Sequence, residues 1–289
     1  MRKNAILLIG LAFAGLQTTA QQVKEPDRTP KEWTTPYQPF QIAGNLYYVG
    51  TSDLTSYLIT TPEGNILINT GLAASASQIK ANIEALGFKF ADTKILLTNQ
   101  AHYDHMGAMA AIKKATGAQL MINEKDAPVV RDGGSSDFEL GGHGSTFAPV
   151  KPDRLLRDRD TISLGGMHLV MLNHPGHTKG SCSYQFTVKD KNRSWNVLIA
   201  NMPTIISDRK FSAIKAYPEI AKDFAYTLQA MKQLTFDIWL AAHASQFALH
   251  SKHKPGDAYN PAAFSGRKDY DASLQELQAS YDKKMKTEK

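Results

Sequence analysis

The sequence has almost no cysteine and no long hydrophobic segment. Cys182 is the only cysteine among 289 residues, so an internal disulfide is impossible and the fold must depend on its hydrophobic core. A hydrophobic content of 42% is ordinary for a globular chain that buries a substantial core. The apolar run at 5–16 has 12 residues, which is too few to span a membrane.

The basic residues show no nucleic-acid-binding pattern. The formal net charge is +6 and the pI is near 9.2, but lysine and arginine are spread along the chain without a basic stripe or interleaved aromatic residues. We therefore expect no nucleic-acid partner and no membrane span, and we predict a monomer. The positive charge is compatible with attraction of an anionic small molecule.

The first 20 residues have the pattern of an export signal. Arg2 and Lys3 precede the apolar run, which ends in the small residues at 18–20. Removing this signal peptide lowers the net charge from +6 to about +4, since two positive charges leave with it. No cysteine follows the run to take a lipid anchor, so we predict a soluble exported protein.

Beyond the signal, the chain divides into an arm and one domain. Four prolines among polar residues at 21–39 predict an extended arm on the surface. No linker interrupts the rest, so we predict a single domain over 40–289.

Each half of this domain has strands in hairpins first and strands alternating with helices later, which predicts two sheets packed face to face with helices outside. We expect strands at 40–42, 46–49, 56–60, 65–68, 93–97, 119–122, 161–164, 167–172, 183–188, 195–199 and 236–242, and helices at 76–86, 106–116, 220–231 and 270–281.

The densest group of possible metal ligands follows the apolar strand at 93–97. It comprises Gln100, His102, Asp104 and His105. In an extended backbone, residues two apart point the same way, so we expect the first three to converge while His105 reaches the other side, which suits two metal positions. Imidazole, carboxylate and amide oxygen together favour zinc. The simpler alternative is a polar loop that caps a helix, with Asp104 as the N-cap.

Two further histidines lie at predicted strand ends. His177 belongs to a tight turn containing Pro175 and Gly176, and His243 follows a strand of apolar residues. We expect Gln100, His102 and His177 to form one metal site, and Asp104, His105 and His243 to form a second site. Taken alone, His243 is equally compatible with a buried core histidine.

These motifs, in this order, resemble the metallo-β-lactamase superfamily. The likeness rests on Gln-Ala-His-Tyr-Asp-His at 100–105, Pro-Gly-His-Thr at 175–178 and Ala-His at 242–243. With Arg-Asp-Gly-Gly-Ser-Ser-Asp at 131–137, the match over roughly 40–270 resembles the subclass B3 enzymes and, among them, the GOB type, which has Gln in place of the first motif histidine. The resemblance implies an α/β fold, the αββα sandwich, with zinc as cofactor. It also implies hydrolysis of β-lactam antibiotics (penicillins, cephalosporins and carbapenems) in a bacterial periplasm, conferring antibiotic resistance.

Two departures from the superfamily pattern bear on the chemistry. Most members have histidine where this chain has Gln100, and an amide oxygen is a weaker zinc ligand than imidazole. We therefore expect two zinc ions, with one possible if the Gln100 site is weak. Met202 stands in a region where many superfamily hydrolases have a metal-bridging aspartate. Because a thioether does not bridge zinc ions held by hard ligands, this position disfavours phosphodiesterase, nuclease or thioesterase activity.

Catalysis would use hydroxide generated by zinc, which lowers the pKa of bound water from about 15.7 to about 7. We expect Asp104 to orient this nucleophile as it attacks the lactam carbonyl. Lys179 and Thr204 are the candidates for binding the substrate carboxylate. The glycine-rich stretch at 132–147 is a candidate cover, with Phe138 or Phe147 as its apolar contact.

Two other functions remain open at this point. One is a related hydrolase that acts on lactones or esters, and the other is a non-catalytic zinc-binding periplasmic protein. The second rests only on the substitution at Gln100.

Overall fold

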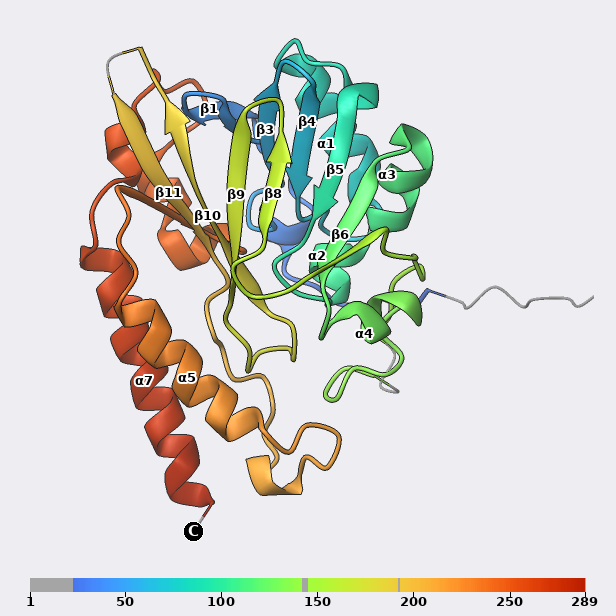
Figure 1. Cartoon of the computed structure of the whole chain (residues 1–289), viewed down its shortest axis with the longest axis vertical. Coiled ribbons are helices and arrows are strands. Elements are labelled where there is room, and N and C mark those ends of the chain that lie inside the picture. Colours follow the sequence, from blue (N-terminus) through green and yellow to red (C-terminus); the bar gives the residue numbers. More distant parts are fainter. Residues whose placement is uncertain (1–22, 142–144, 192, 289) are drawn as a thin grey trace, which may run out of the picture.

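The computed structural model describes residues 23–141, 145–191 and 193–288. The predicted export signal lies outside these residues. Two sheets lie face to face, and helices cover both outer faces, as Figure 1 shows. The predicted sandwich is therefore confirmed. In the described part of the chain, no helix has the length and apolar character needed to cross a membrane.

The first sheet has seven strands in the order β1-β2-β3-β4-β5-β6-β7. Strands β1 to β4 pair antiparallel through hairpins, whereas β5, β6 and β7 continue parallel to β4. Parallel neighbours require crossovers, which the helices supply. The strand bounds are β1 Phe40–Ala43, β2 Leu46–Tyr48, β3 Tyr57–Thr61, β4 Gly64–Ile68, β5 Thr93–Leu97, β6 Gln119–Asn123 and β7 Arg154–Leu156.

The second sheet has five strands in the order β12-β11-β10-β9-β8. Strands β8 to β11 form an antiparallel meander, and β12 pairs parallel to β11. The strand bounds are β8 Thr161–Leu164, β9 Met167–Asn173, β10 Cys182–Lys189, β11 Ser194–Ala200 and β12 Ile238–Ala241.

The α-helices are α1 Ser75–Ala85, α2 Tyr103–Met106, α3 Met109–Thr116, α4 Ala127–Arg131, α5 Ile220–Lys232, α6 Leu249–Lys252 and α7 Lys268–Thr287. Short 3-10 helices are η1 Lys31–Trp33, η2 Phe90–Asp92, η3 Phe211–Ala213, η4 Ala244–Phe247 and η5 Pro261–Phe264.

The prediction of one helix over 106–116 is wrong, because the helix is interrupted between α2 and α3, where Gly107 lies. The Gly107 N–H donates to the Gly71 carbonyl at 2.9 Å instead of to a helical partner. A Cβ on Gly107 would lie 2.4 Å from the backbone of Leu72 and Ala73. The close approach of this backbone segment therefore takes Gly107 out of a continuous helix.

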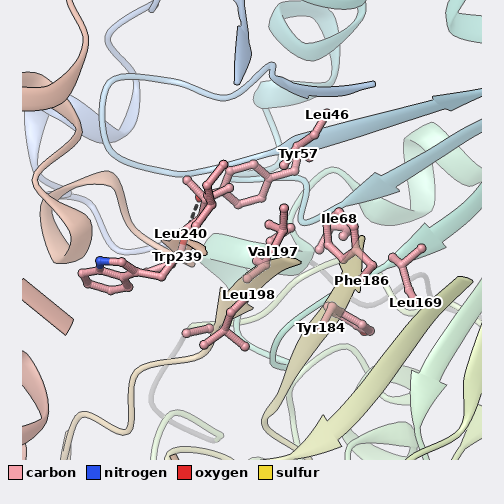
Figure 2. Packing of buried hydrophobic residues seen from close by; sticks show 14 of the residues in the cluster. Leu46, Tyr57, Ile68, Leu169, Tyr184, Phe186, Val197, Leu198, Trp239 and Leu240 are labelled. Atoms are coloured by element: carbon pink, nitrogen blue, oxygen red, sulfur yellow. Dashed lines mark hydrogen bonds between the residues drawn. The ribbon is translucent and has the colours of Figure 1, made fainter. Parts of the chain in front are cut away.

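The core between the sheets follows from the alternation of side chains along each strand. Tyr57 and Ile59 of β3 point into the space between the sheets, whereas Leu58 between them faces the outer helices. Tyr57 is fully buried, and its hydroxyl donates to the Ala241 carbonyl of β12 at 2.6 Å. Figure 2 shows Tyr57 and Ile68 of the first sheet close to Val197 of the second.

The outer faces are apolar as well, which is why these strands are nearly continuous hydrophobic runs. On the first sheet, Leu67 and Leu96 pack in one cluster with residues of α1 and α3. On the second sheet, Trp239 of β12 packs against Tyr270 of α7, with ring centroids 5.3 Å apart. Figure 1 shows α5 and α7 side by side along this face.

This architecture gathers several chain segments at one edge. The segment after β5, the turn between β9 and β10, and the segment after β12 all leave their strands at this edge. Asn99 and Cys182 exchange two hydrogen bonds of 2.9 Å across the first two segments. An antiparallel bridge joins Leu54 to His243. Residues far apart in sequence therefore meet at the ends of the two sheets.

Candidate metal centre

The segment after β5 has a different local structure from the one expected. Asp104 and His105 belong to the short helix α2, and His102 is its N-cap with an extended backbone at φ −101 and ψ 158. The expectation that alternation along an extended strand sorts these ligands is therefore wrong beyond His102. Adjacent residues on a helix project about 100° apart, which lets Asp104 and His105 approach one group while His102 approaches another.

Asp104, His105 and His243 come together as one group. The Asp104 Oδ2 atom lies 3.2 Å from His105 Nε2 and 3.3 Å from His243 Nε2. One ligand atom from each residue falls within 4.8 Å of the others, so one ion could contact all of them. Asp104 and His105 lie in α2, whereas His243 follows β12 directly as the N-cap of η4, so segments far apart in the sequence supply this group.

The side chains of Gln100, His102 and His177 are all buried. Gln100 and His102 lie on the segment after β5, and His177 lies in the turn between β9 and β10. The rings of His102 and His177 have centroids 4.9 Å apart, and Gln100 is 4% exposed. Gln100 Oε1 and His105 Nδ1 make no hydrogen bond within the described chain, and His102 Nε2 and His105 Nε2 have only carboxylate contacts, to Asp137 at 3.5 Å and to Asp104 at 3.2 Å. A buried polar atom without a partner costs about 1–3 kcal/mol, so several such atoms in one place fit a metal ion as their common partner. This donor set of nitrogen and hard oxygen atoms fits zinc.

The histidines at the two distant loops are held through their other ring nitrogen. His177 Nδ1 lies 2.7 Å from the Thr204 carbonyl and 3.0 Å from the Thr204 hydroxyl. His243 Nδ1 lies 3.0 Å from Asp53 Oδ2. Such contacts fix the tautomer and the ring orientation of a ligating imidazole, and they leave Nε2 free for an ion.

The pKa of each of these groups depends on its burial and on its charged neighbours. Burial opposes ionisation of Asp104, but His105 and His243 hold the pKa of its carboxyl well below the usual range. Burial lowers the pKa of His243, yet the hydrogen bonds that its ring donates to Asp104 and Asp53 outweigh burial and raise the value to about 9. Burial lowers the pKa of His177 to about 3, which keeps this imidazole neutral as a metal ligand requires.

Some residues at the centre were not anticipated from the sequence. Asp53 accepts from His243, and its carboxylate also takes the Ser245 N–H at 2.8 Å and the Trp33 Nε1–H at 3.1 Å. Asp137 places Oδ2 3.5 Å from His102 Nε2, an ion-pair contact beyond a good hydrogen bond. Although burial lowers the pKa of His102, Asp137 raises it above the usual value. Asp137 lies in the quoted 131–137 motif, but nothing in the motif shows its partner.

The two predicted substrate contacts, Thr204 and Lys179, have different surroundings. Thr204 holds His177, and Lys179 extends over the Tyr217 ring with Nζ 5.7 Å from its centroid. A pocket of about 320 Å³ adjoins Thr204 and includes Met202, Ser245 and Gln246, with one side of α7 as its other wall.

The glycine-rich stretch at 132–147, of which 142–144 lie outside the described residues, stays a predicted cover, and its two aromatic candidates have different surroundings. Phe147 is fully buried under Gly133 and Gly134, so it packs the domain rather than covering a ligand. Phe138 is partly buried and meets Tyr217 edge to face at 5.1 Å.

Comparison with known proteins identifies the family. A family model described as the metallo-beta-lactamase superfamily matches residues 50–190. The chain is 67% identical to the class B3 di-zinc metallo-beta-lactamase LRA-12 from an Alaskan soil metagenome, with a TM-score of 0.89 over 90% of this chain and 99% of that one. The chain belongs to the metallo-β-lactamase superfamily.

Other members support the same placement. The metallo-beta-lactamase GOB-18 from Elizabethkingia meningoseptica is 56% identical, with a TM-score of 0.92 over 93% of this chain and all of that one. The predicted likeness to B3 and GOB-type metallo-β-lactamases is therefore confirmed. A probable metallo-hydrolase of Burkholderia pseudomallei is 35% identical over 118 residues, which is 39% of this chain and 37% of that protein. The chain thus spans little more than a third of that curated relative.

Proposed function

We propose that the protein is a zinc-dependent β-lactamase that hydrolyses the amide bond of penicillins, cephalosporins and carbapenems and confers resistance to them. The observation that carries this proposal is the buried set of unpaired ligand atoms at one edge of a B3-type sandwich. Gln100, His102 and His177 would hold one ion, and Asp104, His105 and His243 would hold another.

Zinc, when held by these residues, would supply Lewis acidity for the lactam carbonyl and would make hydroxide available from water at neutral pH. The protein supplies orientation. The Asp104 carboxylate is ionised and fixed between His105 and His243, so it is placed to accept a hydrogen bond from the attacking water. Asp53 and Thr204 keep His243 and His177 in the rotation that aims Nε2 inward.

The pocket beside Thr204 is a candidate for part of the bound substrate, although neither Lys179 nor any of the six proposed metal ligands lines it. Its volume of about 320 Å³ lies within the range for small-molecule sites, about 300–1,000 Å³. The Thr204 hydroxyl and the Lys179 ammonium group are the groups that would bind the carboxylate that β-lactams carry. A lysine or hydroxyl contact of this kind orients the lactam relative to Asp104.

A panel of substrates tests the proposal. We expect the purified protein to turn over a penicillin, a cephalosporin and a carbapenem, and to act poorly on a homoserine lactone. Lactone turnover without lactam turnover would refute it in favour of the lactone or ester hydrolase. Zinc uptake with no turnover of any substrate would identify a non-catalytic zinc-binding protein.

The location of the protein and its assembly belong to the same proposal. The export pattern at 1–20 supports secretion into the periplasm, where β-lactams meet their targets. We propose that the mature protein, 21–289, acts there as a monomer with one catalytic domain at 40–289.

A further inference from the structure

Asp126 is a buried carboxylate outside the proposed ligand set. It precedes α4 and is 2% exposed. Its Oδ2 atom accepts the Ala101 N–H at 3.0 Å and the Thr178 hydroxyl at 2.7 Å, and its Oδ1 atom accepts the Gly180 N–H at 2.7 Å. Burial raises the pKa of Asp126, and the bonds from Thr178 and Gly180 offset part of this rise.

The donors belong to two loops that come from different sheets. Ala101 stands between Gln100 and His102 on the segment after β5, and Thr178 follows His177 directly in the turn before β10. One side chain therefore joins the two loops at the residues next to the proposed ligands. The His102 and His177 rings are 4.9 Å apart across this connection.

Close packing keeps this connection short. A Cβ on Gly180 would lie 2.5 Å from the Asp126 backbone nitrogen and 2.7 Å from its Cγ. Only glycine lets the turn approach the carboxylate this closely. The two Asn99–Cys182 bonds join the same loops at the strand ends, so Asp126 supplies the second connection, nearer to the ligands.

We propose that Asp126 is a positioning residue that sets the separation of His102 and His177, so that the metal site of Gln100, His102 and His177 depends on it. This inference rests on the proposed zinc function. Asp104, His105 and His243 receive no contact from Asp126 through these bonds, so their site should bind zinc independently of it. The weaker amide ligand at Gln100 makes the first site especially dependent on good placement of its two imidazoles.

Asp126→Asn is the direct test. If the amide oxygen takes the place of Oδ2, the amide N–H₂ faces the Gly180 N–H, and two donors meet at a position where the carboxylate accepted a bond of 2.7 Å. If the amide is reversed, its N–H₂ faces the Ala101 N–H and that bond is lost, while the Thr178 hydroxyl has to turn from donating to accepting. Either arrangement loosens the link between the loops.

The experiment measures the zinc stoichiometry and, by chelator competition, the Kd of each bound zinc equivalent. The visible spectrum of the cobalt-substituted protein is recorded as a second readout. Asp126→Asn should weaken the binding of one zinc equivalent by about 10–100-fold, the usual effect of removing a group that hydrogen-bonds around a metal ligand. In a His102→Ala background, which already lacks this site, Asp126→Asn should change the remaining equivalent by no more than about twofold. Thr178→Val should reproduce part of the loss, and Thr178→Ser, which keeps the hydroxyl, should restore binding.

Asp153→Asn is a control for loss of a carboxylate away from the site: Asp153 also accepts a backbone N–H, from Leu120 at 2.7 Å, at the opposite end of β6, but it is more exposed than Asp126 and pairs with Lys113. Equal weakening of both equivalents, or a lower melting temperature with unchanged zinc affinities, would overturn the role of Asp126. If Asp126→Asn does not fold, the Thr178 pair decides the question by the same readouts. Failure of the unmodified protein to bind zinc would instead overturn the proposed function.

Discussion

Replacing Asp53 by asparagine should weaken zinc binding by Asp104, His105 and His243 without unfolding the protein. Asp53 Oδ2 holds His243 Nδ1 at 3.0 Å, and its Oδ1 accepts the Ser245 N–H at 2.8 Å. An asparagine of the same shape can keep one of these acceptors, but it loses the negative charge that fixes the imidazole. The neighbours stabilise this charge: burial opposes ionisation, but His243 and Ser245 lower the pKa of Asp53 to about 2.

The size of the effect follows from the contacts. Loss of a carboxylate that orients a ligating histidine typically costs about 10–100-fold in metal affinity. At 1.36 kcal/mol for each factor of ten, this corresponds to about 1.4–2.7 kcal/mol. Only one of the two ions should be affected, because Asp53 touches His243 but none of Gln100, His102 and His177.

The assay is a zinc titration against a chromogenic chelator, with the melting temperature of each sample recorded beside it. Asp153→Asn, at the far end of the first sheet, again serves as the control for loss of a carboxylate. Unchanged affinity of both equivalents in a folded Asp53→Asn protein would refute the reasoning. Weakening confined to the equivalent that also depends on Asp126 would show that the two sites had been assigned wrongly.

Three further changes test other parts of the account. Gln100→His should tighten zinc at the site with His102 and His177, because imidazole binds zinc better than an amide oxygen does; an unchanged Kd in chelator competition would contradict this. Gly107→Ala should lower the free energy of unfolding in urea by about 1–3 kcal/mol, because the new Cβ would lie 2.4 Å from backbone atoms. Ala111→Ser, at an exposed position, is the control and should cost less than about 0.5 kcal/mol. Trp239→Ala should cost about 3–5 kcal/mol in the same assay because the side chain is 1% exposed, and a loss below 1 kcal/mol would show that the core there tolerates a cavity.

Strand positions could be predicted from the sequence because alternation and turn residues are local signals. The bounds of β5 and β8 match the predictions at 93–97 and 161–164. Local signals failed at Gly107, where the break in the helix comes from backbone 36 to 34 positions earlier in the chain, at Gly71 to Ala73. A hydrophobic pattern carries no information on such a close contact between backbone segments that are distant in the sequence.

The candidate ligands could be predicted for a similar reason, since histidines at strand ends point to a shared edge. Their supporting carboxylates could not. Asp53 is 190 positions from His243, and Asp126 is 52 positions from Thr178. Acidic residues in turns are common, so no pattern marks these as partners. Asp104, His105 and His243 come together as predicted, but through α2 rather than through an extended backbone, and the second ligand group stays a prediction.

The most direct test of the central claim is carbapenem hydrolysis by chelator-treated protein as zinc is returned. We expect the treated protein to lose turnover and to regain it in proportion to zinc bound, with Asp104→Asn remaining inactive at saturating zinc. Full turnover after verified removal of the metal would contradict the account.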